Sequence, residues 1–397
     1  MNEADFPTPD ATVESIAPED LEARIEAGDA VTILDVRVES EYDTWSIDGE
    51  SVESVNVPYY QFLDDPDETV LDQVPEADPL VVVCAKGGAS EYVAGVLTEE
   101  RGIDAINLED GMNGWANIYH RREVTNYDGP GAVYQYQRPS SGCLGYLVVS
   151  EGEAAVVDPL RSFTDRYFDD VDEFDASLEY AIDTHIHADH VSGVRDLDED
   201  GVEGFIPEAS VQRGVTYAED LSQLADGDAV QVGEATIEAV YTPGHTTGMT
   251  SYLVGGSVLL TGDGLFVESV ARPDLEEGDE GAPDAARQLY ETLQERILTL
   301  PDDTIIAGGH SSDAAEAAAD GTFTARLGDL VEDMEPLRMD VDDFVEIVLA
   351  DMPPRPANYE DIIATNLGQN AIDDEEAFEL ELGPNNCAAS GEALTGD

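Results

Sequence analysis

The sequence predicts two successive folded regions: an α/β domain built on a parallel sheet, followed by a mixed α+β domain with antiparallel strands. Three observations lead to this expectation. Apolar strand-like segments alternate with helical segments over residues 18–116, which is typical of a parallel sheet covered by helices. Between residues 132 and 262 apolar segments follow one another across short turns, which favours antiparallel pairing. With 397 residues, 42% of them hydrophobic, the chain is long enough for two or three domains with real cores.

The first region begins with residues 18–28, where an early proline, acidic residues in the first turn and a closing glycine predict a short amphipathic helix. A second helix is expected over residues 91–101. Residues 121–132, with several charged residues and a Gly-Pro-Gly sequence, are expected to form a linker. Buried strands are expected at residues 30–37, 55–58, 80–84 and 103–108.

The second region should contain a hairpin over residues 230–241, an amphipathic helix over residues 284–300 and a further helix over residues 340–351. The acidic residues 196–201 are expected to form a solvated loop. Strands are expected at residues 132–137, 145–149, 154–158 and 178–183. The two ends are expected to be loosely ordered, namely residues 1–12 and an acidic tail over residues 370–397.

The charge balance is extreme, with 89 acidic against 17 basic residues and a formal net charge of −72. The acids are spread along the whole chain, and the apolar runs between them argue against a disordered acidic protein. A dispersed acidic excess of this kind resembles the proteins of halophiles that accumulate salt, where screening makes self-repulsion tolerable. The same charge excludes nucleic acid and anionic membranes as favourable partners.

The three cysteines, Cys84, Cys143 and Cys387, are widely spaced and odd in number, which is no disulfide framework and suits a reducing compartment. Cys143 is expected to be a buried structural thiol, with a place in the wall of the site as the alternative. No signal peptide opens the chain, and no apolar run approaches the ~20 residues of a membrane span. We therefore expect a soluble, cytoplasmic protein, and the sequence leaves a homo-oligomer open.

The most informative feature of the first region is Cys84, which ends an expected strand and precedes Ala-Lys-Gly-Gly-Ala-Ser and a helix. Backbone N–H groups at such a helix start can converge on an anion, and the helix dipole favours thiolate over thiol. Gly87 and Gly88 let the backbone wrap closely, and Lys86, the single lysine of the chain, adds positive charge. We expect Cys84 to be catalytic, with Lys86, Gly87, Gly88 and Ser90 binding its substrate; a buried, inert cysteine is the alternative.

Three short motifs carry a resemblance of the first region to the rhodanese family: Leu34–Arg37 with Glu41–Tyr42, Cys84–Ser90, and Gly111–Trp115. The resemblance covers residues 13–122 and implies that Cys84 carries sulfane sulfur as a persulfide. The loop has Ala89 where many members of the family have arginine, which argues against thiosulfate as the sulfur donor.

One stretch of the second region concentrates potential metal ligands. Residues 184–190 read Thr-His-Ile-His-Ala-Asp-His and directly follow an apolar, strand-like segment. Because alternate residues of an extended segment point the same way, His185 and His187 can face one point. A turn would then bring Asp189 and His190 in from another side. Imidazole and carboxylate together are the ligand set of zinc or non-haem iron, not of calcium or magnesium.

Other potential ligands follow strand-like segments further along the chain. His245 and His310 each stand in a Gly-His pair, and Asp263 closes a Thr-Gly-Asp sequence. The order of these motifs over residues 130–340 resembles the metallo-β-lactamase superfamily, which implies an αββα sandwich and two metal positions. The residues implied for the first position are His185, His187, His245 and Asp263, and those for the second are Asp189, His190, His310 and Asp263.

Two further segments narrow the resemblance to the persulfide dioxygenase branch: Arg272-Pro-Asp274, and Pro-Pro-Arg-Pro-Ala-Asn within residues 352–368. That branch implies one Fe(II) per chain, held by His185, His245 and Asp263, with three positions left for thiol substrate and O2.

Two roles outside the metal ligands follow from the same resemblance. Asp189 would act as a base for bound water or sulfur. Arg272 would bind a substrate carboxylate through a bidentate pair, with a structural ion pair as the alternative.

The implied function is iron-dependent oxidation of a low-molecular-weight thiol persulfide by O2 to sulfite, coupled to sulfane-sulfur transfer on Cys84. A dinuclear zinc thioester hydrolase resembling glyoxalase II is the alternative, because every residue of the second position is present. A sulfur carrier with a structural metal is disfavoured, since structural zinc sites are normally closed by four ligands, often including cysteine. The expected boundaries are residues 13–122 and 130–340 for the two domains and residues 341–369 for a helical extension of the second.

Overall fold

The computed structural model describes residues 11–63, 66–312, 314–350, 352, 354–356 and 358–383. They form two compact units, one built mainly from the residues up to Ile118 and the other running from Tyr119 to Glu381. Among the described helices, none has the length and apolar character that a membrane span needs. Cys387, the residues up to 10 and the last part of the expected acidic tail lie outside the described residues.

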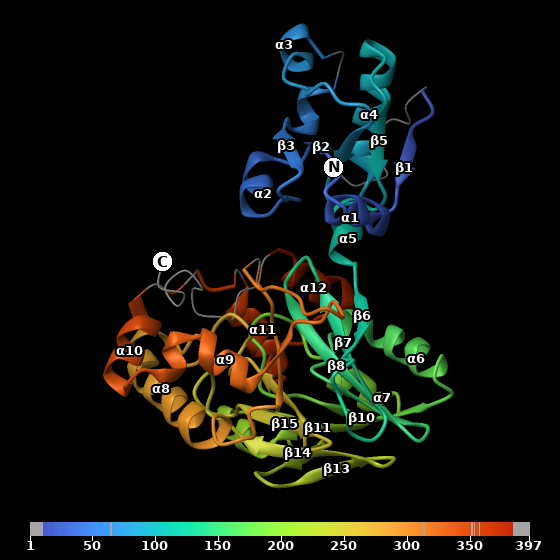
Figure 1. The fold of residues 1–397 in the computed structure, drawn as a ribbon. Helices are drawn as coiled ribbons and strands as arrows, with labels where there is room; N and C mark the ends of the chain where they lie inside the picture. The colour runs from blue at the N-terminus through green and yellow to red at the C-terminus, as the bar shows by residue number, and fades with distance from the viewer. Residues whose placement is uncertain are drawn as a thin grey trace. The chain divides into compact units, whose positions relative to one another are not determined.

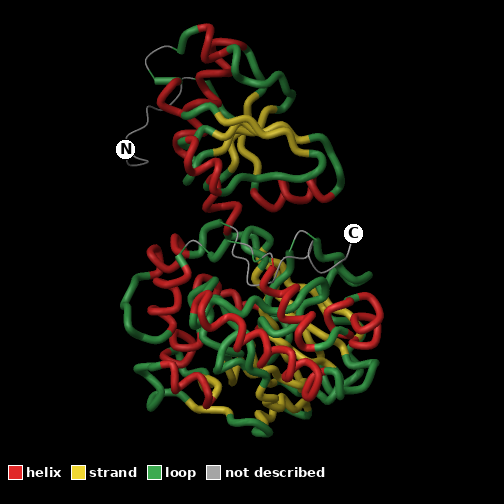
Figure 2. The backbone as a smooth tube through the Cα atoms, turned by 90° about the vertical axis from the view of Figure 1, so that its left-hand side faces the viewer, coloured by secondary structure: helices red, strands yellow, loops and turns green. Residues whose placement is uncertain are grey.

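The first unit is a five-stranded parallel sheet in the order β1-β5-β4-β2-β3, enclosed by helices (Figure 2). The central strand β4 is buried along its whole length, as a strand covered on both faces must be. This confirms the predicted parallel α/β domain. The strands are β1 (Glu14–Ile16), β2 (Val31–Asp35), β3 (Val52–Asn56), β4 (Leu80–Val83) and β5 (Ala105–Leu108). The helices are α1 (Pro18–Glu26), α2 (Glu39–Thr44), α3 (Glu68–Leu71), α4 (Gly88–Arg101) and α5 (Gly111–Ala116), with a turn of 3₁₀-helix at Tyr59–Gln61.

The second unit contains two mixed sheets (Figure 1). The first has the strand order β12-β11-β10-β9-β8-β7-β6, and the second has the order β13-β14-β15-β16-β17-β18. The first sheet consists of β6 (His120–Glu123), β7 (Ala132–Arg138), β8 (Cys143–Ser150), β9 (Glu153–Val157), β10 (Ser177–Ile182), β11 (Glu203–Pro207) and β12 (Ser222–Leu224). The second consists of β13 (Ala229–Val232), β14 (Ala235–Tyr241), β15 (Thr250–Val254), β16 (Val258–Gly262), β17 (Ile305–Gly308) and β18 (Thr324–Arg326).

Three apolar cores show how these sheets and helices are layered. The central core joins the inner faces of both sheets, for example Val148 of β8 with Ile237 of β14. A second core joins the first sheet to helices α6 and α7, and a third joins the second sheet to α8, α9 and α10. This helix–sheet–sheet–helix order confirms the predicted sandwich. The described helices of the unit are α6 (Thr164–Asp172), α7 (Val194–Glu199), α8 (Gly278–Thr292), α9 (Leu327–Asp333), α10 (Val341–Ala350), α11 (Tyr359–Asn366) and α12 (Asp374–Leu380), with short helical turns at Arg161–Phe163, Glu208–Arg213, Leu293–Ile297 and Glu335–Arg338.

Two segments of the second unit differ from the expectations drawn from the sequence. Charged residues at the start of the expected linker form β6, which pairs antiparallel with β7 and extends the first sheet. This pairing is a long-range contact that a charged local sequence does not reveal. Residues 196–201, expected to be a solvated loop, contain most of α7. Val194 and Leu197, one helical turn apart, are both buried and hold this helix on the core.

The described part of the expected acidic tail is ordered as far as Glu381. A capping box starts α12, because Asp373 accepts the N–H of Glu376 and the Glu376 side chain accepts the N–H of Asp373. Ala377 is fully buried, and Glu381 is only 1% exposed. The acidic composition suggested a solvated tail, but tertiary partners for these residues decide otherwise.

Candidate metal centre and cysteine loop

Strand ends of the second unit deliver the expected ligands to one edge of the sandwich. The segment between β10 and α7 carries residues 183–192, and the connection from β14 to β15 carries His245. Strands β16 and β17 are parallel neighbours, so Asp263 and His310, just beyond them, leave their sheet at the same edge. Carboxyl ends of neighbouring parallel strands are where α/β folds commonly gather a site.

Three side chains converge with unused polar atoms. Nε2 of His185 lies 3.7 Å from Oδ2 of Asp263, and Nε2 of His245 lies 3.6 Å from the same oxygen. All three side chains are buried, and none of these three atoms has a hydrogen-bond partner among the described residues. Leaving such atoms buried and unpaired is costly. Two atoms that share a cation at ~2.1 Å lie roughly 3.0–3.5 Å apart, so the group fits one metal ion.

Hydrogen bonds on the far side of each imidazole aim these nitrogens. His245 Nδ1 lies 2.9 Å from the carbonyl oxygen of Arg272, which can only accept, so Nδ1 carries the proton and Nε2 the lone pair. His185 Nδ1 lies 2.9 Å from Oγ1 of Thr184, whose own hydroxyl donates to Asp158. Such partners behind a ligand set the tautomer and the ring orientation that a metal requires.

The protonation states also suit a metal. Burial lowers the pKa of His185 and of His245, so both imidazoles are neutral at pH 7. Burial alone would raise the pKa of Asp263, but His310 and then His185 outweigh it and keep that pKa below its usual value. Neutral imidazole and ionised carboxylate are the forms that bind a cation.

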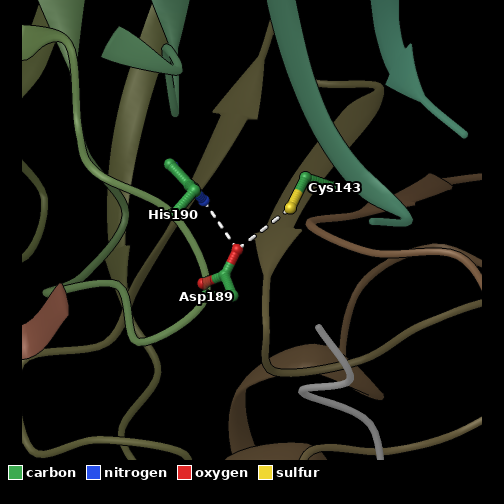
Figure 3. A group of neighbouring side chains, drawn as sticks. All are labelled: Cys143, Asp189 and His190. Atoms are coloured by element: carbon green, nitrogen blue, oxygen red, sulfur yellow. Dashed lines mark hydrogen bonds and ion pairs between the residues drawn. The ribbon is translucent and has the colours of Figure 1, made fainter. Parts of the chain in front are cut away.

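A second group of side chains gathers around Asp189. Its Oδ2 lies 2.6 Å from Nδ1 of His190 and 3.2 Å from Sγ of Cys143, as Figure 3 shows. The sequence favoured a structural thiol at Cys143; the thiol is buried, and the structure puts its sulfur in the wall of the site. Burial and Asp189 raise the pKa of this thiol, but His310 and His190 bring it below the usual value.

His310 links the two groups. Its Nδ1 lies 2.8 Å from Oδ1 of Asp263, and its Nε2 lies 3.1 Å from Oδ2 of Asp189. Each nitrogen of the His310 ring thus faces a carboxylate oxygen. Every residue expected for the second metal position is therefore brought together. Nε2 of His190 is buried without a hydrogen-bond partner among the described residues, whereas His310 is held by bonds to Asp263 and Asp189. A cation at that position would have to displace these bonds.

His187 takes a different orientation from His185, although both were expected to be ligands. Its Nε2 lies 3.1 Å from Oδ1 of Asp158 and 3.6 Å from Oδ1 of Asp183, and its Nδ1 lies 3.9 Å from Oδ1 of Asp189. Burial lowers the pKa of His187, but the carboxylates of Asp158 and Asp183 outweigh this effect, and the resulting pKa is about 9. The sequence analysis missed both aspartates. The signal was their position directly after β9 and β10, which pair in parallel and so end side by side.

Arg272 is buried and engaged by other protein groups. Its Nε and Nη2 donate to the two carboxylate oxygens of Asp274 at 2.8 and 3.1 Å, and its Nη1 donates to the carbonyl oxygen of Pro354. Of the two sequence-based interpretations, the structural ion pair is therefore the one that the structure contains. The backbone carbonyl of Arg272 accepts the hydrogen bond that orients His245.

In the first unit, Cys84 lies just beyond β4 and is 5% exposed. The N–H of Gly87 and the hydroxyl of Ser90 each donate to its sulfur at 3.1 Å. Gly87 has a φ of +95°, which other residues rarely adopt, so the loop depends on glycine there. Gly88 begins α4, and Lys86 stands half-buried in the loop. The structure thus brings together the loop residues that the sequence singled out.

Comparisons with known proteins agree with both folds. Residues 140–310 match the metallo-beta-lactamase superfamily, and residues 17–118 match the rhodanese-like domain. The mitochondrial persulfide dioxygenase ETHE1 of Homo sapiens is 28% identical over 255 residues, 62% of this chain and 93% of that protein. Its Bos taurus counterpart is 31% identical over 196 residues, 48% of this chain and 73% of that protein.

Two further similar proteins are a hydrolase and a protein of known structure. A cytoplasmic hydroxyacylglutathione hydrolase of Arabidopsis thaliana is 27% identical over 231 residues, 56% of this chain and 81% of that protein. The crystal structure of ETHE1 from Myxococcus xanthus superposes with a TM-score of 0.51 at 28% identity, over 59% of this chain and 98% of that one. The chain therefore belongs to the metallo-beta-lactamase superfamily, in the family of the persulfide dioxygenase ETHE1, and is a metal-dependent enzyme with an additional rhodanese-like domain.

Proposed function

We propose that the second unit oxidises a low-molecular-weight thiol persulfide with O2. The balanced reaction is RSSH + O2 + H2O → RSH + HSO3⁻ + H⁺, in which the outer sulfur loses four electrons and O2 gains them. The observation that carries the proposal is the convergence of three buried, unpaired atoms: Nε2 of His185, Nε2 of His245 and Oδ2 of Asp263. The similarity to persulfide dioxygenases supports the same substrate class.

Fe(II) is the metal that we propose for this group, one per chain. Held by His185, His245 and Asp263, such an iron would supply activation of O2 beside a thiol substrate, the chemistry that a set of two imidazoles and one carboxylate supports. His187, His190 and His310 would act from outside this set. Because His310 already joins two carboxylates through hydrogen bonds, the geometry favours one cation over two.

Asp189 is the proposed catalytic carboxylate, which would accept a hydrogen bond from bound water or from the persulfide. His190, Cys143 and His310 all donate to its Oδ2, so three groups hold the carboxylate in one orientation. Burial opposes the ionised form of Asp189, but His190 and His310 keep its pKa well below the usual value. Its charge is thus maintained inside the protein, where it can orient a proton donor.

Cys84 is the proposed sulfur carrier of the first unit. Attack of its thiolate on the outer sulfur of RSSH breaks the S–S bond, forms the Cys84 persulfide and releases RS⁻. The two donors at its sulfur, Gly87 and Ser90, would stabilise the anion before and after transfer. We assign Lys86 and Gly88 to the same substrate-binding loop. With Ala89 in this loop, a thiol persulfide suits it better as donor than thiosulfate.

The alternative function is hydrolysis of a thioester by two zinc ions. It is favoured by the short distances among Asp189, Asp263 and His310, whose ligand atoms all lie within 4.8 Å of one another. The similarity to hydroxyacylglutathione hydrolase points the same way. Against it stands the cost of displacing the His310 hydrogen bonds, which a second cation would require.

One experiment separates the two. Protein purified without added metal is analysed for iron and zinc. O2 uptake and sulfite are then measured with a thiol persulfide on the same sample and after anaerobic loading with Fe(II). We expect one iron per chain and one sulfite per O2 consumed. Two zinc ions per chain with thioester hydrolysis and no O2 uptake would overturn the proposal. The Cys84→Ser variant serves as the control, since oxidation of a soluble persulfide should survive it.

A further inference from the structure

The segment between β10 and α7 needs partners for its backbone. Residues 183–192 are almost all buried and belong to no named strand or helix, yet they carry Asp189 and His190. Buried backbone groups outside regular structure must be paired by other parts of the chain. Two residues from the C-terminal part of the unit provide four of these bonds.

Asn366, the last residue of α11, provides three of them. Its amide Nδ2 donates to the carbonyl of His187 at 3.0 Å and to that of His190 at 2.8 Å. Its Oδ1 accepts the N–H of Ser192 at 3.0 Å. The side chain is 2% exposed, so its amide serves the ligand-bearing segment and not solvent.

Glu381, just beyond α12, provides the fourth. Its Oε1 accepts the N–H of Val191 at 2.7 Å, and its Oε2 pairs with Nη1 of Arg138 at 2.5 Å. The Arg138 guanidinium lies 5.3 Å from the ring centre of Phe163 and 5.4 Å from that of Phe378. Both charged side chains are about as buried as the apolar core around them. The pair therefore fixes Glu381 in place.

We propose that Asn366 and Glu381 are positioning residues for Asp189 and His190, an inference that rests on the proposed persulfide oxidation. Two of these bonds, at the His190 carbonyl and the Val191 N–H, fall on the peptide group that follows His190. The other two fall on either side of this pair, at the His187 carbonyl and the Ser192 N–H. No hydrogen bond described between these two residues and the protein goes to the side chain of His185, His245 or Asp263. Losing a positioning bond should therefore lower turnover and leave the metal in place.

The first test replaces Asn366 by alanine in the full iron-loaded chain. We expect kcat to fall by roughly 10–100-fold, as for other partners that orient a metal site, with one iron per chain retained. Gln137→Ala is the matched control. It also removes a buried amide of the same unit, one that donates to Gln135 and to the Gly321 carbonyl. Gln137→Ala should lower the melting temperature but not kcat.

A double-mutant cycle asks whether Asn366 acts through Asp189. If it does, Asn366→Ala should change kcat far less in an Asp189→Asn chain than in the parent, because the group that it positions is already impaired. Fully additive losses would overturn the proposal.

A spectroscopic measurement tests the positioning role independently of enzyme activity. In the zinc-loaded chain, the proton between Nδ1 of His190 and Asp189 should give a downfield imidazole ¹H resonance, since the atoms are 2.6 Å apart. We expect Asn366→Ala and Glu381→Leu to shift or broaden it, and Glu381→Gln, which keeps the acceptor for Val191, to restore it. An unmoved resonance in both disruptive variants would overturn the positioning role. Absence of O2 uptake in the parent, with the resonance still sensitive, would instead reject the proposed oxidation alone.

Discussion

At the scale of single residues, Asp263 is where the two halves of the site meet. Its Oδ2 faces Nε2 of His185 and of His245, while its Oδ1 is bonded to His310. One carboxylate thus contributes a ligand atom to the proposed iron and also orders the neighbouring hydrogen bonds. Its amide analogue would keep the shape but lose the charge that a cation requires.

We therefore expect Asp263→Asn to lower iron affinity by at least about tenfold, within the range reported for a weakened metal site. Elemental analysis after dialysis against a fixed free-iron concentration measures it. Asp274→Asn is the matched control, because Asp274 is also buried but pairs with Arg272 instead of facing the metal group. Equal iron retention by the two variants would contradict the assignment.

Asp274 itself should give stability a pH dependence. Burial raises the pKa of its carboxyl, but Arg272 and Arg355 outweigh this and leave the pKa below its usual value. A depressed folded-state pKa stabilises the protein above the unfolded value of about 3.9, and this contribution is lost as pH falls through the folded value. The urea midpoint of Asp274→Asn should therefore lie below that of the parent at pH 7 and approach it below about pH 4. A constant gap across that range would count against this.

At the scale of elements, α11 and α12 give the acidic C-terminal segment a helical structure within the second unit (Figure 1). Their contribution depends on two side chains, Asn366 and Glu381, and on Arg138 at the end of β7. The Arg138–Glu381 pair has no solvent to screen it, so each charge depends on the other. The helices therefore dock through polar contacts that a hydrophobic pattern does not predict.

Removing one partner of this pair should be costly. We expect Glu381→Leu to destabilise the second unit by roughly 3–5 kcal/mol, because the buried Arg138 charge loses its carboxylate partner. The double variant with Arg138→Met should recover much of that loss. Chemical denaturation monitored by far-UV circular dichroism measures the free energy of unfolding of the single and the double variant. A single variant as stable as the parent would show that the pair contributes nothing.

At the scale of the whole molecule, the net charge of −72 is the main factor that opposes folding. Like charges spread over the surface repel one another, and this repulsion weakens as the Debye length shrinks with added salt. The ordered C-terminal segment is itself acidic, with Asp373, Asp374 and Glu376 in the capping box and first turn of α12. Folding thus has to overcome a repulsion that salt relieves.

We expect the melting temperature to rise steadily between about 0.1 M and about 3 M KCl, and the protein to lose structure at low salt. Calorimetry or circular dichroism over this series checks it, with an equal series of sucrose as the control for general exclusion effects. Equal melting temperatures across the KCl series would rule out the charge-based account.

The sequence by itself determined the two fold classes and the kinds of residue available for chemistry. Alternating strands and helices, Gly-His pairs and the Cys84 loop are local patterns, so they are readable without coordinates. The carboxyl ends of parallel strands then bring His185, Asp263 and their neighbours together, as such patterns lead one to expect.

Only the tertiary structure decided which nitrogen of each histidine points inward and which groups lie behind it. Asp158 reaches His187 from 29 residues away, and Asn366 reaches the same histidine's carbonyl from 179 residues away. The end of helix α12 is likewise held by a partner distant in the chain, since Arg138 pairs with Glu381. Hydrophobic periodicity indicates only which face of a helix or strand is buried. The direction of a side-chain hydrogen bond depends on sheet register and helix docking, which no local pattern encodes.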